Sequence, residues 1–422
     1  MNIGIIGNGG REHSLCFKLK QSPLVNKIFC IPGNGGTSEI VENLEVNYND
    51  FPKLAKIISK KKIDLIFVGP EEPLVNGIVD FFKKKEVKII GPSRSASKLE
   101  GSKVFMKNFC KKFKIPTAKY IEIVSYRNLG NKLNKFNLPI VVKSDGLAAG
   151  KGVTIFNNIS DAKKEIKLIL NGKFKTSKKV LVEEFLEGEE ASYFVLTDGK
   201  NYLPIGTAQD HKRIGENDTG PNTGGMGAYS PSYLITKSIE KKILKKIIEP
   251  TISGMKKMRS NYIGILYAGL MINKSEPKLI EYNIRFGDPE CQVLMMRLKN
   301  DLADLFKSIF NNTLQKKRIS WTKECGITVV AASKGYPNKF KRKVEIKNIN
   351  KFKNTNKKQL FHAGTIRDKN GKVYSMSGRV LNSTVISNSL KFARKKANKI
   401  LEKLNWKNKY FRRDIGNKFL DK

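Results

Sequence analysis

The sequence predicts a globular α/β fold at the N-terminus, followed by α+β units. Short apolar strands at residues 3–7, 27–31, 65–68 and 87–90 alternate with helical stretches, a rhythm typical of a parallel sheet covered by helices on both faces. A glycine-rich stretch at 139–153 follows an apolar strand, and strands with one amphipathic helix recur after residue 326. Because 422 residues can bury several cores, we expect two to four structural units.

Composition narrows the class of protein. Hydrophobic residues make up 40% of the chain, and no run of 18 apolar residues predicts a membrane span. The five cysteines form no C-x-x-C pair, which indicates reduced thiols and a cytoplasmic protein. The net charge of +42 fits either nucleic-acid binding or a lysine-rich composition. The basic clusters lie in separate segments without interleaved aromatic residues, so we expect no specific nucleic-acid partner and no membrane partner.

The first strand is followed by the turn N-G-G-R-E-H at 8–13 and a helix over about 12–20. The unpaired N–H groups of a helix N-terminus favour an anion, and Arg11 would strengthen such a site through a bidentate contact. A surface turn is the alternative, and a dinucleotide-binding fold is a weaker one because G-x-G-x-x-G is absent. Loops also follow strand ends at 32–37, 68–73 and 91–93, so we expect one shared pocket at this edge of the sheet.

The stretch P-I-V-V-K-S-D-G-L-A-A-G-K-G-V at 139–153 is the strongest indication of chemistry. Its glycines would let backbone N–H groups approach a polyphosphate, while Lys143 and Lys151 would neutralise its charge. It is not a P-loop, because Gly152 follows Lys151 where Ser or Thr would hold magnesium. A helix expected over 95–113 carries Lys103, for which a solvated surface position is the alternative.

Acidic residues follow the apolar strand that begins at Val180. This strand delivers Glu183 and Glu184, and a short connection then leads to Glu190. Such a connection between strands suits the edge of an adenine, and a carboxylate shortly after it can accept both ribose hydroxyls; solvated acidic residues near a turn are the alternative. The glycine-rich segment 204–231 indicates a lid, in which we assign His211 no catalytic role.

Polar residues also alternate along the strand expected at 278–282. Glu281 and Asn283 share one face of this strand, and their carboxylate and amide oxygens suit magnesium that is shared with phosphates. Arg285 continues the same face, and Asp288 lies just beyond. A buried ion pair is the alternative. Arg379, after a glycine in the last unit, could hold a phosphate.

At this point the chain resembles, over almost its whole length, the phosphoribosylamine–glycine ligase family of the ATP-grasp superfamily. The matching motifs occur in one order: G-N-G-G-R-E-H (7–13), P-G-N-G-G-T (32–37), V-G-P-E-E-P-L-V-N-G (68–77), L-E-G-S-K (99–103), K-S-D-G-L-A-A-G-K-G-V (143–153), E-E-F-L-E-G-E-E-A-S (183–192), Q-D-H-K-R (209–213), D-T-G-P-N-T-G-G-M-G-A-Y-S-P (218–231), R-F-G-D-P-E (285–290), G-R-V-L (378–381) and F-R-R-D-I-G (411–416). The resemblance implies a Rossmann-like N-terminal substrate domain at 1–101, a two-lobed ATP-grasp region at 102–325 with a mobile small lobe at 118–195, and a small α+β C-terminal domain at 326–422.

The resemblance also implies the site residues. ATP would contact Lys103, Lys143, Gly146, Ala149, Gly150, Lys151, Gly152, Glu183, Glu184, Phe185, Leu186 and Glu190. Glu281 and Asn283 would bind Mg²⁺ or Mn²⁺. The amine substrate would contact Gly9, Gly10, Arg11, Glu12, Glu71, Asp210, Asp288 and Arg379. We expect Lys143 and Arg285 to be the catalytic residues.

The implied activity is an ADP-forming ligation of glycine to 5-phospho-β-D-ribosylamine in purine biosynthesis, with glycine, phosphoribosylamine and ATP as the partners of a monomer. Two alternatives stay open. One is another ATP-grasp ligase or carboxylase that acts on a different acid or amine, and the other is a basic nucleic-acid-binding protein.

Overall fold

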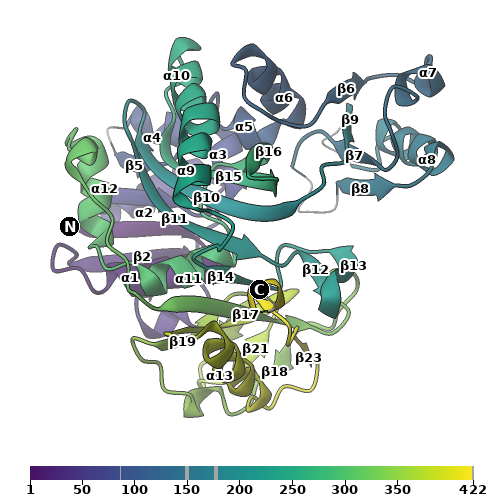
Figure 1. The fold of residues 1–422 in the computed structure, drawn as a ribbon. Helices are drawn as coiled ribbons and strands as arrows, with labels where there is room; N and C mark the ends of the chain where they lie inside the picture. The colour runs from purple at the N-terminus through teal and green to yellow at the C-terminus, as the bar shows by residue number, and fades with distance from the viewer. Residues whose placement is uncertain (86, 148–151, 175–178, 421–422) are drawn as a thin grey trace.

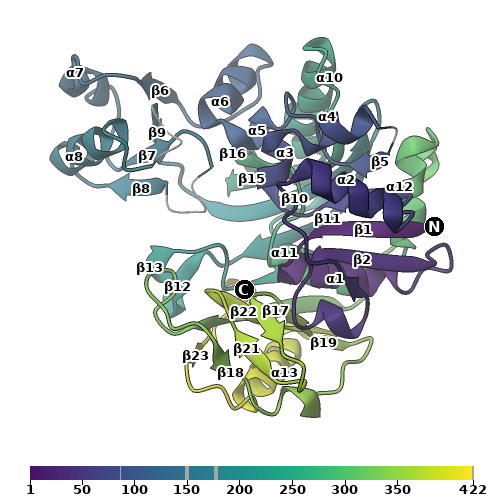
Figure 2. The same cartoon turned by 180° about the vertical axis from the view of Figure 1, so that it is seen from behind.

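The structure is a computed structural model that describes residues 1–85, 87–147, 152–174 and 179–420. Figure 1 shows the N-terminal sheet (purple) beside a long sheet of teal and green strands, with the C-terminal elements (yellow) below and a small lobe projecting to one side. The view from behind in Figure 2 shows the same small lobe standing apart from the rest. The mixture of α/β and α+β units confirms the predicted fold class. Within the described ranges, no helix combines the length and the apolar character that a membrane crossing requires.

The N-terminal unit is a parallel sheet of five strands in the order β3-β2-β1-β4-β5. The strands are β1 (Asn2–Gly7), β2 (Lys27–Pro32), β3 (Glu42–Asn43), β4 (Leu65–Val68) and β5 (Lys88–Ile90), and the helices between them are α1 (Gly10–Leu19), α2 (Phe51–Lys60), α3 (Glu71–Asn76) and α4 (Ile78–Lys83). Strand β4 is buried along its whole length, as its continuous apolar run predicts for a sheet covered on both faces. The loops after β1 and β4 therefore meet at one edge, where a ligand can bind.

A long antiparallel sheet forms the middle of the molecule, in the order β16-β15-β10-β11-β14-β17-β22-β19 with β23 also on β17. Its strands are β10 (Glu189–Asp198), β11 (Tyr202–Asp210), β14 (Gly227–Ser230), β15 (Ile263–Asn273), β16 (Glu276–Asn283), β17 (Cys325–Ser333), β19 (Lys358–His362), β22 (Arg379–Ser387) and β23 (Lys409–Tyr410). Two core clusters each combine side chains of this sheet with side chains of the N-terminal sheet. The two sheets thus share their cores and pack as one body.

The small lobe is a four-stranded antiparallel sheet in the order β6-β9-β7-β8 with two helices. Its elements are β6 (Tyr120–Ile123), α7 (Leu129–Leu133), β7 (Ile140–Ser144), β8 (Val153–Phe156), α8 (Ile159–Leu170) and β9 (Val180–Glu184). Among the described residues, the lobe has a core of its own that takes no residue from the other units. We expected the lobe to reach residue 195, but β10 hydrogen-bonds to β15 from Glu189 onwards and so belongs to the long sheet.

The remaining α-helices of the described chain lie outside the small lobe. They are α5 (Lys98–Gly101), α6 (Lys103–Lys112), α9 (Lys237–Ile243), α10 (Glu249–Lys257), α11 (Glu290–Arg297), α12 (Leu302–Phe310), α13 (Leu390–Glu402) and α14 (Asn417–Leu420). The C-terminal part adds a three-stranded sheet of β18 (Val344–Glu345), β20 (Thr365–Arg367) and β21 (Val373–Ser375). All residues of α11 are buried, because α11 packs between α1 on one side and β17 and β22 on the other.

The helix expected over 95–113 is two helices. Ser102 has extended backbone angles (φ −142°, ψ 114°) and ends α5, and its hydroxyl accepts the N–H of Phe105 as the N-cap of α6. Lys103 is therefore the first residue of α6, not a residue in the middle of a helix. The break between α5 and α6 therefore sets the position from which the Lys103 side chain extends.

Candidate active site

The loop after β1 is organised around the carboxylate of Glu12. Glu12 Oε2 accepts the N–H of Gly9 at 2.6 Å, and Glu12 Oε1 accepts Arg11 Nε at 2.6 Å. A Cβ atom built on Gly7, Gly9 or Gly69 would lie less than 3 Å from the Glu12 side chain. The glycines of this edge thus leave room for one buried carboxylate, and that carboxylate fixes the direction of Arg11.

Arg11 connects this loop to the segment that follows β16. Its Nη1 donates to the carbonyl oxygen of Phe286 at 3.0 Å. The adjacent Arg285 lies between two carboxylates: its Nε donates to Glu71 at 3.2 Å and its Nη2 to Glu100 at 2.9 Å. Burial by itself would raise the pKa of Glu71, but the guanidinium groups of Arg285 and Arg11 outweigh it and lower that pKa to about 2. Glu71 is therefore ionised at neutral pH.

Glu100 was not singled out by the sequence analysis. Burial raises its pKa to about 7, although the guanidinium of Arg285 opposes this shift. Its second oxygen accepts the N–H of Ile284 at 2.7 Å. The residue lies within the L-E-G-S-K motif, so its motif was visible in the sequence, but its pairing with Arg285 across 185 residues was not.

Arg379, the first residue of β22, reaches the same pocket from the C-terminal part. Its Nη1 donates to the carbonyl oxygens of Gly224, at 2.6 Å, and of Asp288, and it lies 3.6 Å from Asp288 Oδ1. A Cβ on Gly9 would lie 2.9 Å from Asp288 Oδ2, so this carboxylate borders the first loop as well. Burial raises the pKa of Asp288, but Arg379 and Arg11 together lower it below its ordinary value.

Asp210 ends β11 near this group. Its Oδ1 is buried and has no hydrogen-bond partner among the residues that the structure describes. Burial and the nearby carboxylate of Glu290 raise its pKa well above the ordinary range, while Lys212 and Arg379 oppose the shift. A buried carboxylate oxygen without a protein partner is available to a ligand.

The glycine-rich loop of the small lobe begins against the N-terminus of α6. Lys103 Nζ donates to the carbonyl oxygen of Gly146 at 2.8 Å. Asp145 Oδ1 accepts the hydroxyl of Ser102 at 3.1 Å and the N–H of Val104 at 3.2 Å. Burial lowers the pKa of Lys103, and the carboxylate of Glu281 opposes this shift. Three residues predicted to bind ATP, Ala149, Gly150 and Lys151, lie outside the described residues, whereas Gly152 accepts the N–H of Ser144 at 2.8 Å.

Lys143, on β7, contacts the carboxylate of Glu183 on β9 at 2.9 Å, and Lys107 of α6 contacts the other oxygen of Glu183 at 2.9 Å. The Glu183 side chain is thus turned into the protein. Beyond it, Glu184 accepts the N–H of Lys119 at 3.0 Å, Leu186 is half-buried, and the ring of Phe185 is 39% exposed.

The expected metal ligands lie at the end of β16. A β-bulge between Leu279 and Glu281 changes the register with β15, so Glu281 and Asn283 both follow the bulge on the same strand face. Lys212 lies 2.8 Å from Glu190 and 4.0 Å from Glu281. Burial raises the pKa of Glu281, but Lys212 and the other lysines nearby lower it overall.

Among the described residues, no group of three or more His, Cys, Asp or Glu side chains could hold a metal ion. A carboxylate and an amide alone fit Mg²⁺, which is commonly held by one or two carboxylates together with substrate phosphates. Lys212, which connects Glu190 with Glu281, was not predicted to contact either.

The glycine-rich segment forms a hairpin of β12 (Arg213–Gly215) and β13 (Thr219–Asn222). Arg412, from the C-terminal F-R-R-D-I-G motif, donates to Asp218 at 2.8 Å and to the carbonyl oxygen of Arg213 at 3.0 Å. His211 Nε2 accepts the N–H of Gly416 at 3.1 Å, which is a structural contact. The segment expected to be a lid is therefore anchored to the C-terminal part.

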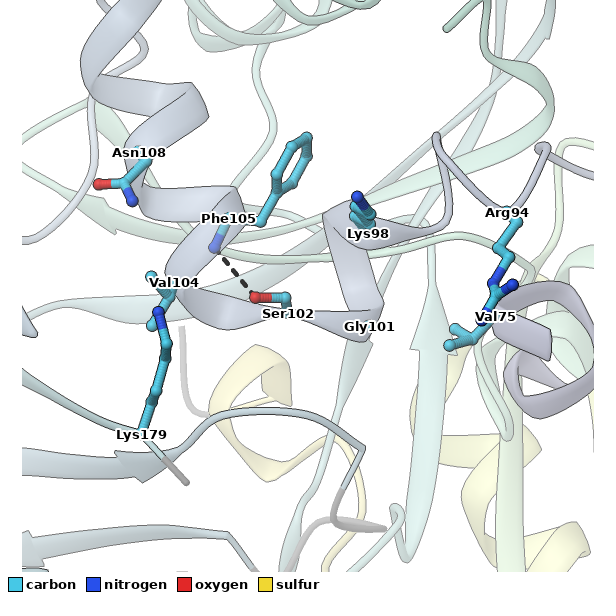
Figure 3. Close-up of a pocket in the computed structure, with 9 residues that line it drawn as sticks. All are labelled: Val75, Arg94, Lys98, Gly101, Ser102, Val104, Phe105, Asn108 and Lys179. Atoms are coloured by element: carbon cyan, nitrogen blue, oxygen red, sulfur yellow. Dashed lines mark hydrogen bonds between the residues drawn. The ribbon is translucent and has the colours of Figure 1, made fainter. Parts of the chain in front are cut away.

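A cavity of about 470 Å³ lies beside α5 and α6 (Figure 3). Its lining comprises Val75, Arg94, Lys98, Gly101, Ser102, Val104, Phe105, Asn108 and Lys179. None of the predicted site residues that the structure describes lines it. It borders the phosphate side of the site only through Ser102, whose hydroxyl also contacts Asp145.

Comparison with known proteins identifies the relatives of this chain. Models of the phosphoribosylglycinamide synthetase family match residues 1–100 (N domain), 101–291 (ATP-grasp (A) domain) and 326–418 (C domain). The phosphoribosylamine–glycine ligase of Haemophilus influenzae is 46% identical over 421 residues, covering 99% of this chain and 98% of that protein. The Brucella melitensis protein of the same name is 44% identical over 417 residues, covering 99% of this chain and 97% of that protein.

Solved structures are also similar to this chain. The phosphoribosylamine–glycine ligase of Thermotoga maritima is 30% identical with a TM-score of 0.86, covering 98% of this chain and all of that chain. A biotin carboxylase domain of Hydrogenobacter thermophilus 2-oxoglutarate carboxylase is 15% identical with a TM-score of 0.74, covering 97% of this chain and 91% of that one, and so shares the fold. With three family models in order along the chain and full-length relatives above 40% identity, the protein belongs to the phosphoribosylglycinamide synthetase family.

Proposed function

We propose that this chain joins glycine to 5-phospho-β-D-ribosylamine in purine biosynthesis and converts ATP to ADP and phosphate through a glycyl phosphate intermediate. Relatives named phosphoribosylamine–glycine ligase match it at 42–46% identity over nearly the full length. The observation that carries the proposal is the meeting of two groups of side chains. Lysines and the strand end that carries Glu281 form one group, and the cluster of arginines and carboxylates around Arg285 forms the other, four residues further along the same segment.

ATP occupies the first group in this proposal. Lys103 and Lys143 neutralise its phosphates, and the loop from Gly146 to Gly152, with Ala149, Gly150 and Lys151, covers them. The backbone of residues 183–186 borders the adenine, and Glu190 accepts the ribose hydroxyls. The exposure of Phe185 supports this placement, because phenylalanine side chains are usually buried in folded proteins.

Glu281 and Asn283 would hold Mg²⁺ or Mn²⁺. When bound, the ion supplies charge neutralisation for phosphoryl transfer. The low pKa of Glu281 supports this role, because the side chain stays ionised and ready to bind a cation.

The amine substrate lies against the first loop, at Gly9, Gly10, Arg11 and Glu12. Glu71, Asp210 and Asp288 surround its polar groups, and Arg379 binds its phosphate. Glu12 acts by orienting Arg11, since both of its oxygens already accept hydrogen bonds. Arg285 binds the glycine carboxylate or its phosphate through the N–H groups that Glu71, Glu100 and the carbonyl oxygen of Phe286 leave unused.

The chemistry follows from the weakness of a carboxylate as an electrophile. An oxygen of the glycine carboxylate attacks the γ-phosphorus of ATP, and ADP leaves. The ribosylamine nitrogen then attacks the carbonyl carbon of glycyl phosphate, the C–O bond to phosphate breaks, and the nitrogen loses a proton. The buried, unpartnered Oδ1 of Asp210 is our candidate to accept that proton.

We further propose that residues 1–101, 102–325 and 326–422 act as the three domains, that the small lobe moves as a unit, and that the protein works as a monomer in the cytoplasm. The separate core of the lobe supports its movement, and the free cysteines are compatible with a reducing compartment.

The test is ADP release with magnesium ATP, adding glycine and freshly generated phosphoribosylamine separately and then together. Turnover that requires both substrates is the expected result. ATP turnover that is insensitive to glycine would keep the nucleotide site and refute the substrate assignment. No turnover in any mixture with folded protein would refute the ligase.

A further inference from the structure

We propose that Lys107, a buried lysine that the reaction itself does not use, is a positioning residue that keeps the positive charge of Lys143 available to the phosphates of ATP. This inference rests on the proposed function in one respect: it takes Lys143 as a phosphate-binding group. It adds a residue of α6 that contacts no ligand.

The surroundings of Lys107 exclude direct contact with a nucleotide. The residue is 0% exposed. Its ammonium lies 2.9 Å from Glu183 Oε2, 2.8 Å from Thr117 Oγ1 and 3.2 Å from the carbonyl oxygen of Ala118. An ammonium has three N–H donors, and these three acceptors engage all of them. Lys107 can therefore act only through its partners.

Its charged partner is shared with Lys143. Glu183 is 3% exposed, and its second oxygen lies 2.9 Å from Lys143 Nζ. Two ammonium groups thus bracket one carboxylate, and the three side chains together carry a net charge of +1. Without Lys107, Glu183 would neutralise Lys143 and hold it inside the lobe, and the net charge of this group would fall from +1 to zero.

The charge balance with Glu183 and Lys143 explains why a lysine is buried at this position. Burial lowers the pKa of Lys107, which reflects the cost of removing its charge from water, and the Glu183 carboxylate opposes that shift. An apolar side chain could fill the same volume at lower cost, and replacing buried ion pairs by apolar residues is often neutral or stabilising. A packing role alone would not require a cation.

A purely mechanical role is the rival explanation. Thr117 and Ala118 lie where the chain enters the small lobe, and Glu183 lies on the strand by which it leaves. Lys107 could therefore only fasten the hinge of the lobe. The two explanations differ in what happens when the charge of Glu183 is removed as well, because that restores the net charge of +1 but not the contacts at the hinge.

The test measures the Kd of magnesium ADP by titration calorimetry, together with the Tm of each variant. The variants are Lys107→Met, Glu183→Gln and their combination, and the matched control is Lys111→Met, which removes an exposed lysine one turn along the same helix. We expect Lys107→Met to weaken ADP binding at least about tenfold, the control to change it less than about twofold, and the added Glu183→Gln to restore most of the loss.

A Lys143→Met background links the effect to its target: there, Lys107→Met should change the Kd no further. Equal ADP binding by Lys107→Met and the control, or a combined variant no better than Lys107→Met, would overturn the inference and leave the hinge role. Should Lys107→Met fail to fold, Glu183→Gln alone decides, since it raises the net charge to +2. ADP binding as tight as or tighter than wild type is then expected, and weaker binding would overturn the proposal.

These outcomes are separable from the proposed function. ADP binding requires neither glycine nor phosphoribosylamine, so a wild-type protein that binds ADP without glycine-dependent turnover would refute the ligase and leave the role of Lys107 testable. A wild-type protein that does not bind magnesium ADP would refute both.

Discussion

Replacing Arg412 with methionine tests whether the glycine-rich hairpin is a fixed wall of the site. The Arg412 side chain is 1% exposed, and its guanidinium donates four hydrogen bonds, to Arg213, to Asp218 and twice to Asp414. Methionine keeps the volume of the stem and removes all four bonds. If these bonds hold the hairpin, both the stability of the C-terminal part and the order of residues 213–222 should fall.

The magnitude follows from the two carboxylates that lose their partner. Burial raises the pKa of Asp218, but Lys418 and Arg412 outweigh it and lower that pKa from 3.8 to about 2, which corresponds to at most about 2.5 kcal/mol. Lys418 supplies part of this, and Asp218 is 32% exposed, so solvent screening reduces the share of Arg412 further. Most of the loss comes from Asp414, whose side chain is only 11% exposed. Breaking a buried ion pair costs about 3–5 kcal/mol, and we expect about 3 kcal/mol, or a Tm lower by about 3 °C for a chain of this length.

The control is Arg413→Met, which removes the same charge one residue later, where the side chain is 62% exposed. Thermal unfolding gives the Tm, and hydrogen exchange reports on residues 213–222. The contribution of Asp218 is complete above the ordinary carboxyl pKa near 4 and is lost as the pH falls towards about 2, so the difference between wild type and Arg412→Met should shrink from pH 7 to pH 3. A Tm for Arg412→Met equal to that of Arg413→Met, with unchanged exchange in the hairpin, would show that the anchoring argument is wrong.

Three further predictions concern the site. Glu281→Ala should abolish glycine-dependent ADP release while the circular dichroism spectrum stays that of wild type; near-normal turnover would remove Glu281 from the metal site. Glu100→Gln should raise the Tm relative to wild type more at pH 8 than at pH 5. The pKa of Glu100 is raised to about 7 in the folded protein, so the wild type loses folding stability as the pH rises to that value, whereas glutamine does not ionise. Equal differences in Tm at both pH values would contradict this. Ser102→Ala should lower stability by about 1 kcal/mol through loss of the N-cap of α6 and should also raise the KM for ATP, because the contact with Asp145 is lost. Ser59→Ala, which changes an exposed serine of α2, is the control.

Much of the fold could be predicted from local pattern. The strand at 276–283 was expected at 278–282, because an apolar run bounded by turns specifies a strand without reference to the rest of the chain. The break at Ser102 could not be predicted from periodicity, since apolar residues continue through it at helical spacing. The cap became visible only where its hydroxyl met Phe105 and Asp145.

The parts of the site that were missed are those set by long-range packing. Arg285 was expected on the metal-ligand face, but that Glu71 and Glu100 hold it, across 214 and 185 residues, follows only from the tertiary structure. Lys107 looked like any lysine of an amphipathic helix, because nothing nearby in the sequence shows that its ammonium will face Glu183. The lid was expected because the segment is rich in glycine, and glycine indicates a flexible backbone. The sequence did not show that Arg412 would hydrogen-bond to Arg213 and Asp218 and hold the segment in place.

The arrangement assigns the two halves of the reaction to parts of different rigidity. Arg285 and Glu281 lie on one segment whose core is shared by the N-terminal sheet and the long sheet, so the substrate side keeps its shape whatever the small lobe does. Lys143 and Gly146 belong to a lobe with a separate core. Gly146 contacts Lys103 of α6, and Lys143 contacts Glu183 of the same lobe, which in turn contacts Lys107 of α6. Lys103 donates one of its three N–H groups to the carbonyl oxygen of Gly146, and a phosphate bound by the other two would be held beside this loop. Nucleotide binding would thereby be coupled to the position of the loop, and glycyl phosphate would form only where the loop has already excluded water.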